Sequence, residues 1–540
     1  MKAMIRQLGE RVLGVLSGFD RLLFRGFLRC VINPRGLNGY LYGAGVPMAD
    51  FGKHAEQVTG QLIDESTRQA RETGREIRYL NDSEISKKDV AAQIARRDNI
   101  DNGLICVLAS VEPCTTLRVR GNRATKKIAI QRERGKCMHL YHYFIHPLFG
   151  FMHVRLQTWF PFTIQVCLNG REWLARDLTK AGIGFLRHDN GIYRVDDLDA
   201  AQRLLDAQLE VSWTTLLGDL ARQVHPAHDS IFANCPTHAR NYYWTVAESE
   251  WASDILFHDP NDVLPLLKRL AAYSMSVHGP GDVLRFFGKR VRADGQPRAD
   301  FRGAIQSDVR LFEEGIRLKH WLNGNSEKMY NKPYTTALRL EATTIHPEEF
   351  KAFRIPENAP PDAKMEWLPV RKGVADLYRR AQVSQAVNDR FFAAQAAVLS
   401  EDATPLKELV AGLCQRVVRP GREKPDGSRT RSRTFRALNP LSPEDIQLLT
   451  LVSHPKFGIS GMRNQDLRSA LYHDAPTDPQ EQRRQSSAIS RKLSLLRAHA
   501  ILEKVQKSHR YRLTEKGRQG LTALLAAANA ATSKLTNLAV

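Results

Sequence analysis

Apolar and polar residues alternate along several short stretches of the chain, which indicates β-strands that each bury one face. The strongest alternation runs through residues 137–170 and 315–344. Apolar residues recur at helical spacing in 51–74, 198–222 and 372–399. These patterns predict an α+β fold in which mostly antiparallel central sheets are flanked by helices.

Changes in the pattern predict a multidomain chain without an evident internal sequence repeat. A polar segment rich in Arg, Pro and Gly separates the last domain and is typical of an extended linker. The predicted parts are a helical N-terminal region (1–76), a central α+β domain (77–415, which could divide into 77–225 and 226–415), the linker (416–440) and a C-terminal domain (441–540).

The C-terminal domain has three short helical patterns followed by a basic hairpin. We expect helices at 442–452, 462–472 and 481–499, a hairpin over 503–513 and a closing helix at 514–525. This order predicts a winged helix-turn-helix, and residues 495–518 resemble the MarR-like group of bacterial DNA-binding domains. A winged helix can also serve only as a protein contact. The side chains expected to contact DNA are Arg483, Arg484, Ser487, Ser490, Arg491, Lys492, Lys507, His509, Arg510 and Arg512.

Charge changes this picture by implying a polyanionic partner. The 540 residues include 79 Lys and Arg against 58 Asp and Glu, a net charge of +21. Nucleic acid is the favoured partner and a membrane surface the second. No stretch approaches the roughly 18 apolar residues of a membrane span. Seven scattered cysteines without a CxxC pair indicate reduced thiols and a cytoplasmic location.

The segment with the most chemical information is a predicted hairpin within residues 315–344. A loop at Pro333–Thr336 would pair Tyr330 with Arg339 and Lys328 with Glu341, and would place Lys332 beside them. The preceding strand turns at Asn323-Gly324, so that either Lys319 or His320 would lie beside Tyr330. Nearby cations favour the phenolate form of a tyrosine. The alternative is a solvated strand that only binds phosphate.

Residues 328–332 and 338–341 resemble the "basic-x-Tyr-Asx-Lys … Arg-x-Glu" core of rolling-circle replication initiators. The resemblance implies that Tyr330 nicks one DNA strand and stays joined to its 5′ phosphate. Lys328, Lys332 and Arg339 would then hold the phosphate, while Glu341 would orient a cation or bind metal. Lys319, Arg371 and Lys372 are expected to contact DNA, and His320 to assist in catalysis.

A nicking tyrosine generally needs a divalent metal, here Mg²⁺ or Mn²⁺. A hairpin closing at Pro147–Gly150 would place His142 and His153 on one face as ligands. Glu250 and Asp254 share a face as either a strand or a helix and are the acidic alternative. Packed core histidines and surface carboxylates are the simpler interpretations of both pairs. The aromatic residues Tyr242, Tyr243, Trp244 and Trp251 could stack unpaired bases or pack in the core.

Together these features predict a metal-dependent tyrosine endonuclease of a mobile or plasmid-like element that nicks and rejoins single-stranded DNA. A non-enzymatic winged-helix DNA-binding regulator is the first alternative, and an RNA-binding or RNA-processing protein is the second. Motifs for nucleotide hydrolysis, dinucleotide binding and zinc proteolysis are missing from the sequence. No membrane partner is expected, and the sequence does not predict the oligomeric state.

Overall fold

One large sheet organises most of the chain in the computed structural model. The structure describes residues 2–122, 127–226, 228–292, 297–298, 301–312, 315–332, 334–357, 359–360, 363–395, 412–421, 430–439, 442–454, 457, 461–472, 478–505, 508–514, 517–518, 520–521 and 524–525. Eleven strands form the sheet, and every neighbouring pair is antiparallel except β2–β3. Their order is β10 (Ile305–Phe312), β11 (Gly315–Leu322), β12 (Asn325–Asn331), β13 (Ala337–Thr344), β9 (Tyr242–Phe257), β1 (Val12–Leu28), β6 (Ile164–Asn169), β5 (Gly150–Gln157), β4 (Lys127–His146), β3 (Gly103–Asn122) and β2 (Arg78–Tyr79).

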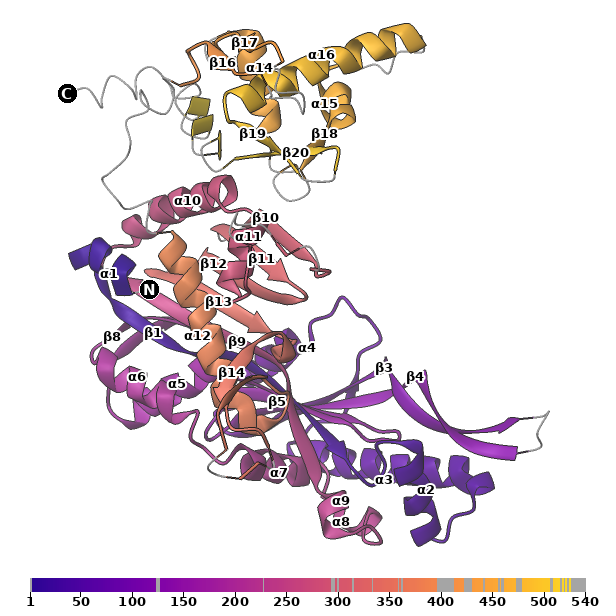
Figure 1. Cartoon of the computed structure of the whole chain (residues 1–540). Coiled ribbons are helices and arrows are strands. Elements are labelled where there is room, and N and C mark those ends of the chain that lie inside the picture. The colour runs from indigo at the N-terminus through magenta and orange to yellow at the C-terminus, as the bar shows by residue number, and fades with distance from the viewer. Residues whose placement is uncertain are drawn as a thin grey trace.

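The sheet is built from two halves with the same connectivity, joined along β1 and β9 (Figure 1). Each half begins with its central strand, continues through helices and then forms a four-stranded meander. The meander is β3 to β6 in the first half and β10 to β13 in the second, and its last strand pairs with the central strand. The structure thus contains a repeated topology that the sequence does not reveal as a repeat.

Helices pack on both faces of the sheet and leave part of one face uncovered. We call the face that carries Tyr330 the front face and the opposite one the back face. On the back face lie α2 (Pro34–Gly43), α3 (Phe51–Glu72), α7 (Trp213–Val224), α10 (Pro260–Val277), α11 (Pro280–Phe286) and α12 (Leu377–Ala394). On the front face lie α4 (Lys87–Arg97), α5 (Gly170–Lys180), α6 (Leu198–Ala207) and the hairpin of β7 (Phe185–His188) and β8 (Gly191–Val195).

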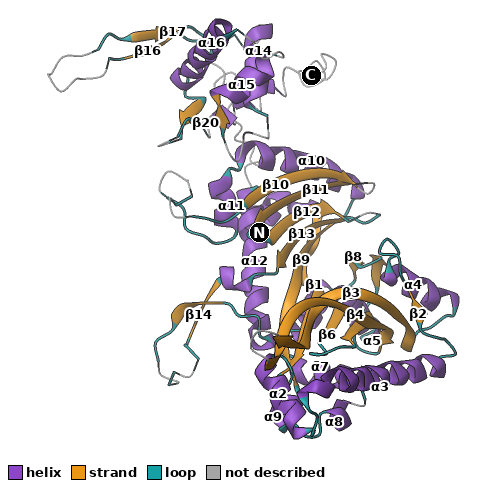
Figure 2. Cartoon of the chain, turned by 90° about the vertical axis from the view of Figure 1, so that its right-hand side faces the viewer, coloured by secondary structure: helices purple, strands orange, loops and turns teal. Residues whose placement is uncertain are grey.

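The remaining elements connect or extend this core. They are α1 (Lys2–Leu8), α8 (His228–Ile231), α9 (Thr237–Arg240), the β14 (Lys351–Arg354) and β15 (Glu366–Pro369) hairpin, and four 3₁₀ turns at Gly9–Arg11, Met48–Asp50, Pro347–Glu349 and Val374–Asp376. Figure 2 shows the β14 segment projecting away from the body of the protein. Among the described residues, no helix is long and apolar enough to cross a lipid bilayer.

The C-terminal unit has its own core, and Figure 1 shows it beside α10 and β10. It comprises α14 (Pro443–Val452), β18 (Met462–Arg463), α15 (Asn464–Leu471), α16 (Pro479–Ala498), β19 (Leu502–Lys504) and β20 (Arg510–Leu513). Its three strands form a small sheet in the order β18-β20-β19. The expected helices and hairpin are therefore present, while the closing helix at 514–525 lies partly outside the described residues.

Two predicted boundaries are wrong. Residues 1–76 are not a separate helical region, because β1 supplies the central strand of the first half. Its apolar residues lie on both faces of a buried strand, which gives a nearly continuous apolar run instead of alternation. The described residues of the segment predicted as a linker (416–440) also belong to the C-terminal unit, whose core includes Leu413 before it. Arg436 pairs with Asp445, Leu438 lies in the core of the C-terminal unit, and β16 (Val417–Arg419) pairs with β17 (Arg433–Phe435).

Candidate functional site

A polar pocket of about 360 Å³ opens on the front face where the two halves of the sheet meet. Strands β1, β9, β12 and β13 supply its floor, and the β7–β8 hairpin supplies one wall. The side chains that carry its chemistry are Asp20, Glu250, Lys328, Tyr330, Lys332 and Glu341.

The hairpin register predicted for the central segment is confirmed. Tyr330 pairs with Arg339 and Lys328 with Glu341, and the Lys332 N–H donates to the Ala337 carbonyl. Asn323 closes the preceding turn in the left-handed region with a φ of 51°. Alternation within β12 and β13 sends Met329 and Leu340 to the back-face core, and so leaves the charged residues on the front face.

Tyr330 is hydrogen-bonded to a carboxylate and is not surrounded by unpaired cations. Its hydroxyl donates to Glu341 Oε2 at 2.5 Å, and the Lys328 ammonium contacts both Glu341 and Glu250. Burial and the negative charge of Glu341 raise the pKa of Tyr330 well above its usual value, although Arg339 opposes the shift. The expectation that nearby cations favour the phenolate is therefore wrong for the unliganded chain.

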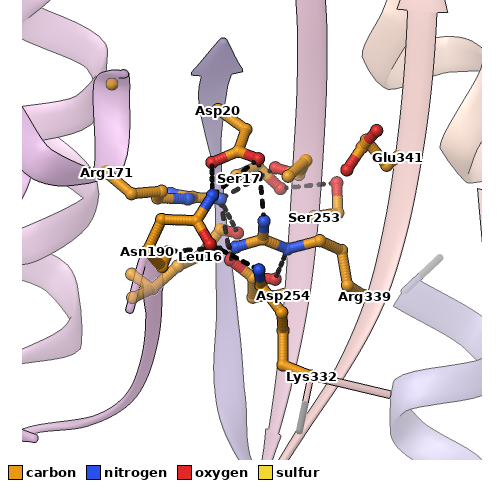
Figure 3. Close-up of polar contacts among 12 residues, drawn as sticks. Leu16, Ser17, Asp20, Arg171, Asn190, Ser253, Asp254, Lys332, Arg339 and Glu341 are labelled. Atoms are coloured by element: carbon orange, nitrogen blue, oxygen red, sulfur yellow. Dashed lines mark hydrogen bonds and ion pairs between the residues drawn. The ribbon is translucent and has the colours of Figure 1, made fainter. Parts of the chain in front are cut away.

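A buried ion network lies beneath the pocket, and Figure 3 shows Arg339 between Asp20 and Asp254. Arg339 donates to Asp254 with Nε at 2.5 Å and Nη2 at 2.9 Å, and to Asp20 with Nη1 at 3.0 Å. Arg171 contacts Asp254 at 3.0 Å and also donates to the carbonyls of Leu16 and Ala252. Arg339 and Asp254 are almost completely buried, so neither the predicted phosphate contact of Arg339 nor the metal role of Asp254 fits. Both residues position the pocket from below.

Asp20 reaches the pocket because β1 contains a bulge. In the pairing with β9, Phe19 lies opposite Trp251 and Arg21 opposite Glu250, so that Asp20 is the additional residue. A bulge redirects a side chain in this way, and bulges are common beside active sites. Asp20 accepts hydrogen bonds from Asn169, which also caps α5, and from Asn190 between β7 and β8.

Three carboxylates in the pocket form a candidate cation site. One oxygen from each of Asp20, Glu250 and Glu341 lies within 4.8 Å of the other two. These side chains come from β1, β9 and β13, three adjacent strands. A set of carboxylate oxygens is the donor type that Mg²⁺ and Mn²⁺ prefer. Of the predicted residues, Glu250 lies in this group, and so does Glu341, which was expected either to orient a cation or to bind metal; Asp20 was missed.

The predicted histidine pair does not form a metal site. Three residues, 147–149, close the β4–β5 hairpin, so His146 pairs with Gly150, His142 with Val154 and Tyr143 with His153. This differs by one residue from the expected register, and such a slip sends a side chain to the other face. His142 therefore lies on the back face beside Ser66 of α3, and burial lowers its pKa to about 4. His153 stays on the front face, against Tyr143.

The expectation for Lys319 and His320 also needs correction. Arg317, and neither of these two residues, lies opposite Tyr330. His320 is on the back face between Ser274 and Ser307, and burial lowers its pKa to about 3, so it takes no part in the pocket. Lys319 is on the front face with its ammonium 4.3 Å from the centre of the Trp321 ring.

The aromatic residues available for base stacking differ from those predicted. Trp244 and Trp251 are buried and Tyr242 is packed, whereas Tyr243 is exposed and lies against Arg29. The exposed aromatic cluster instead lies on and beside the β14–β15 hairpin. Phe353, Trp367 and Tyr378 are 52%, 64% and 41% exposed, and the first two rings lie 5.5 Å apart. We call these three residues the aromatic cluster. The alternation of apolar and polar residues around them does not distinguish them from core residues.

Most of the other predicted DNA contacts are at the surface. Arg371 and Lys372 form ion pairs with Glu357 and Glu348 in the segment before α12. On α16, Lys492 is partly buried, whereas Arg483, Arg484, Ser487, Ser490 and Arg491 are exposed. In the small sheet, Arg512 pairs with Glu503, Arg510 donates to the Gly461 carbonyl, and His509 is exposed. Lys507 lies outside the described residues.

Comparisons with known proteins identify no significant relative of the chain. No family model matches the chain, and neither a curated protein nor a solved structure resembles it significantly.

Proposed function

We propose that the chain is a nucleic-acid enzyme that cleaves a DNA strand by attack of Tyr330 on a phosphodiester. The observation that carries this proposal is the 2.5 Å hydrogen bond from Tyr330 to Glu341 in a pocket open to solvent. A nucleophile held against a carboxylate base is the arrangement that covalent catalysis requires. The net charge of +21 supports a polyanionic substrate.

The proposed step transfers two protons and exchanges one ester bond. The phenol proton passes to Glu341 Oε2 as the Tyr330 oxygen bonds to phosphorus. The bond from phosphorus to O3′ breaks, which leaves a 5′-phosphotyrosine and a free 3′ end. Lys328 lies against both Glu250 and Glu341 and protonates the departing O3′. Lys332, bound to Asn190 at the pocket wall, attracts the phosphate.

A divalent ion fits the same pocket. Asp20, Glu250 and Glu341 would hold Mg²⁺ or Mn²⁺, whose charge would polarise the scissile phosphate. A cation bound there would favour the phenolate and so oppose the upward shift in the pKa of Tyr330. Arg339 and Arg171 hold Asp254 and Asp20 in place from below, so the chain supplies a rigid frame for the ion.

The aromatic cluster supports single-stranded DNA as the substrate. Phe353, Trp367 and Tyr378 border a groove of about 1200 Å³ that also includes the exposed cations Arg290 and Lys351. Aromatic rings stack on unpaired bases at about 1–3 kcal/mol each, while neighbouring cations follow the backbone. A base-paired strand cannot offer its faces in this way.

The C-terminal unit supports recognition of a duplex beside the cleavage point. Its order of helix, short strand, two helices and a two-stranded hairpin is the order expected of a winged helix-turn-helix, in which α16 would be the recognition helix. This observation also favours the second candidate function, a DNA-binding regulator without catalysis.

A covalent-trapping experiment tests the proposed cleavage. The full chain is incubated with 5′- and 3′-labelled single-stranded DNA and Mn²⁺, then denatured and separated by size. We expect an adduct carrying only the label on the 3′ side of the cut, and its loss in Tyr330→Phe. Tyr334→Phe is the control, because Tyr334 is a highly exposed neighbour that an unspecific reaction would modify.

The outcomes separate the candidate functions. An adduct that persists in Tyr330→Phe would exclude this tyrosine as the nucleophile. Binding without cleavage in Mg²⁺ or Mn²⁺ would favour the regulator, and cleavage or binding of RNA in preference to DNA would favour the RNA alternative. For the duplex, replacing both Arg483 and Arg491 by Ala should weaken binding and reduce the salt dependence by roughly one unit per lost phosphate contact.

A further inference from the structure

Two cysteines and a histidine meet at the base of the long β3–β4 ribbon, far along the sheet from Tyr330. Cys114 lies on β3, and Cys137 and His139 lie on β4 with one residue between them. Cys137 pairs with Glu112 and His139 with Ser110, so strand alternation places all three side chains on the front face. One ligand atom from each lies within 4.8 Å of the other two.

The distances fit a shared metal ion. The two sulfur atoms are 3.2 Å apart, longer than the roughly 2.05 Å of a disulfide bond. In tetrahedral zinc sites, bonds of about 2.3 Å to sulfur and about 2.0 Å to nitrogen place the ligand atoms about 3.5 Å apart. The two sulfur atoms therefore need to separate only slightly to bind one ion, and a nitrogen of His139 lies within 4.8 Å of both.

A hydrogen bond from one nitrogen of His139 to a backbone carbonyl leaves the other nitrogen available to a metal. The Nδ1 atom lies 3.2 Å from the Cys137 carbonyl oxygen, which suits an Nδ1–H donor and leaves the lone pair on Nε2. Metal-binding histidines commonly fix their tautomer through such a bond to a carbonyl.

The position of Cys114, Cys137 and His139 in the fold indicates what a metal bound there would do. His139 and Gln157 form the last pair between β4 and β5, and among the described residues no further strand pairs with either side of the ribbon beyond this point. Figure 1 shows the ribbon continuing away from the body of the protein. Its projecting part carries the basic residues Arg118, Arg120, Lys127, Arg132, Arg134 and Lys136. A cross-link here would fix the angle at which a basic ribbon leaves the sheet.

We propose that Cys114, Cys137 and His139 bind one Zn²⁺ ion that joins β3 to β4 at the base of the ribbon. Thiolate and imidazole donors select Zn²⁺ over the hard cations suited to the carboxylate pocket. Binding releases one proton from each thiol to solvent, and a water molecule completes the four ligands. This site does not depend on the proposed cleavage chemistry.

Metal analysis of the full chain tests the site. Protein purified with a non-thiol reductant is assayed for zinc by mass spectrometry and then titrated with Co²⁺ after zinc removal. We expect about one zinc per chain and a thiolate-to-cobalt charge-transfer band. Cys114→Ser and Cys137→Ser should lose both signals, whereas Cys414→Ser, which removes an exposed cysteine elsewhere, should retain them.

Either of two results would overturn the proposal. The first is wild-type protein with less than about a tenth of an equivalent of zinc and no charge-transfer band on adding Co²⁺. The second is an intact mass two hydrogens lighter in the absence of reductant, with peptide mapping that joins Cys114 to Cys137. The wild-type cobalt titration keeps the test decisive even where a serine variant fails to fold.

Discussion

Each half of the sheet contains a tyrosine that donates to a glutamate on the front face. In the second half Tyr330 donates to Glu341 at 2.5 Å, and in the first half Tyr141 donates to Glu112 at 2.7 Å. Both glutamates also contact a lysine, Lys328 in one case and Lys87 in the other. The hydrogen bond alone therefore does not distinguish a nucleophile from a structural contact.

The residues around the two glutamates distinguish the two tyrosine–glutamate pairs. Glu341 has Asp20 and Glu250 close by, so a cation can be shared among three carboxylates at an open pocket. Glu112 instead accepts from Arg155 at 2.6 Å, and no such acidic group surrounds it among the described residues. A tyrosine–glutamate pair thus becomes a candidate for catalysis only where a metal and a phosphate can both approach.

The largest expected effect comes from removing the proposed base. Glu341→Gln keeps the size of the side chain but cannot accept the phenol proton, so the cleavage rate should fall by about 10²–10⁴-fold. Glu112→Gln is the matched control and should leave the rate unchanged. Single-turnover cleavage of labelled DNA measures both, and equal losses in the two variants would contradict the distinction between the halves.

Breaking the buried ion network should destabilise the protein. Arg339→Met leaves Asp20 buried without a guanidinium partner and Asp254 with Arg171 alone, at a cost of about 3–5 kcal/mol in the free energy of unfolding. Arg155→Met breaks a partly exposed pair and should cost only about 1 kcal/mol. Urea denaturation followed by circular dichroism measures the difference; similar values would show that burial of Arg339 contributes little.

Metal affinity should depend on the carboxylates of the shared pocket and not on Glu112 of the first half. Glu250→Gln removes one carboxylate of the three and should weaken Mn²⁺ binding about tenfold, equivalent to about 1.4 kcal/mol. The Glu112→Gln variant should bind as wild type does. Isothermal titration with Mn²⁺ in the absence of DNA gives both affinities. Unchanged binding by Glu250→Gln would remove this residue from the cation site.

The smallest expected effect concerns acid stability of the first half. Burial opposes the shift, but hydrogen bonds from Ser110 and Tyr141 and the charge of Arg155 lower the pKa of Glu112 to about 2. Because this lies below the ordinary value of 4.5, its stabilisation is complete above that pH and is lost as the pH falls towards 2. The difference in unfolding free energy between wild type and Glu112→Gln should narrow over this range. A difference in unfolding free energy that stays constant over this pH range would show that ionised Glu112 is not the source of the stabilisation.

Local patterns in the sequence predicted the parts of the site that are local in the chain. The Tyr330–Arg339 register followed from alternation on both sides of a short loop, and it is confirmed. The His142 register followed from the same reasoning and is wrong, because one residue of difference in loop length reverses the face. Alternation therefore predicts which side chains share a face only where the length of the turn between the two strands is also predicted correctly.

The residues that complete the pocket could not be predicted in this way. Asp20 lies in a strand without alternation, at a bulge that appears only when β1 pairs with β9. Arg171 and Asn190 reach the network from α5 and the β7–β8 hairpin, which are adjacent to β13 in space but not in sequence. Such contacts depend on the order of strands in the sheet, about which a single sequence carries little information.

The pairing of β1 with β9 also determines when the pocket can form during folding. Asp20 and Arg339, whose side chains are 3.0 Å apart, are separated by 319 residues along the chain. Contacts between such distant residues form late, after the intervening loops have closed. During synthesis, the first half leaves the ribosome with Asp20 but without Tyr330, Lys328 or Glu341. A chain released before the second half is complete would therefore carry the basic ribbon and Asp20, and yet lack most of the other charged side chains that make up the pocket.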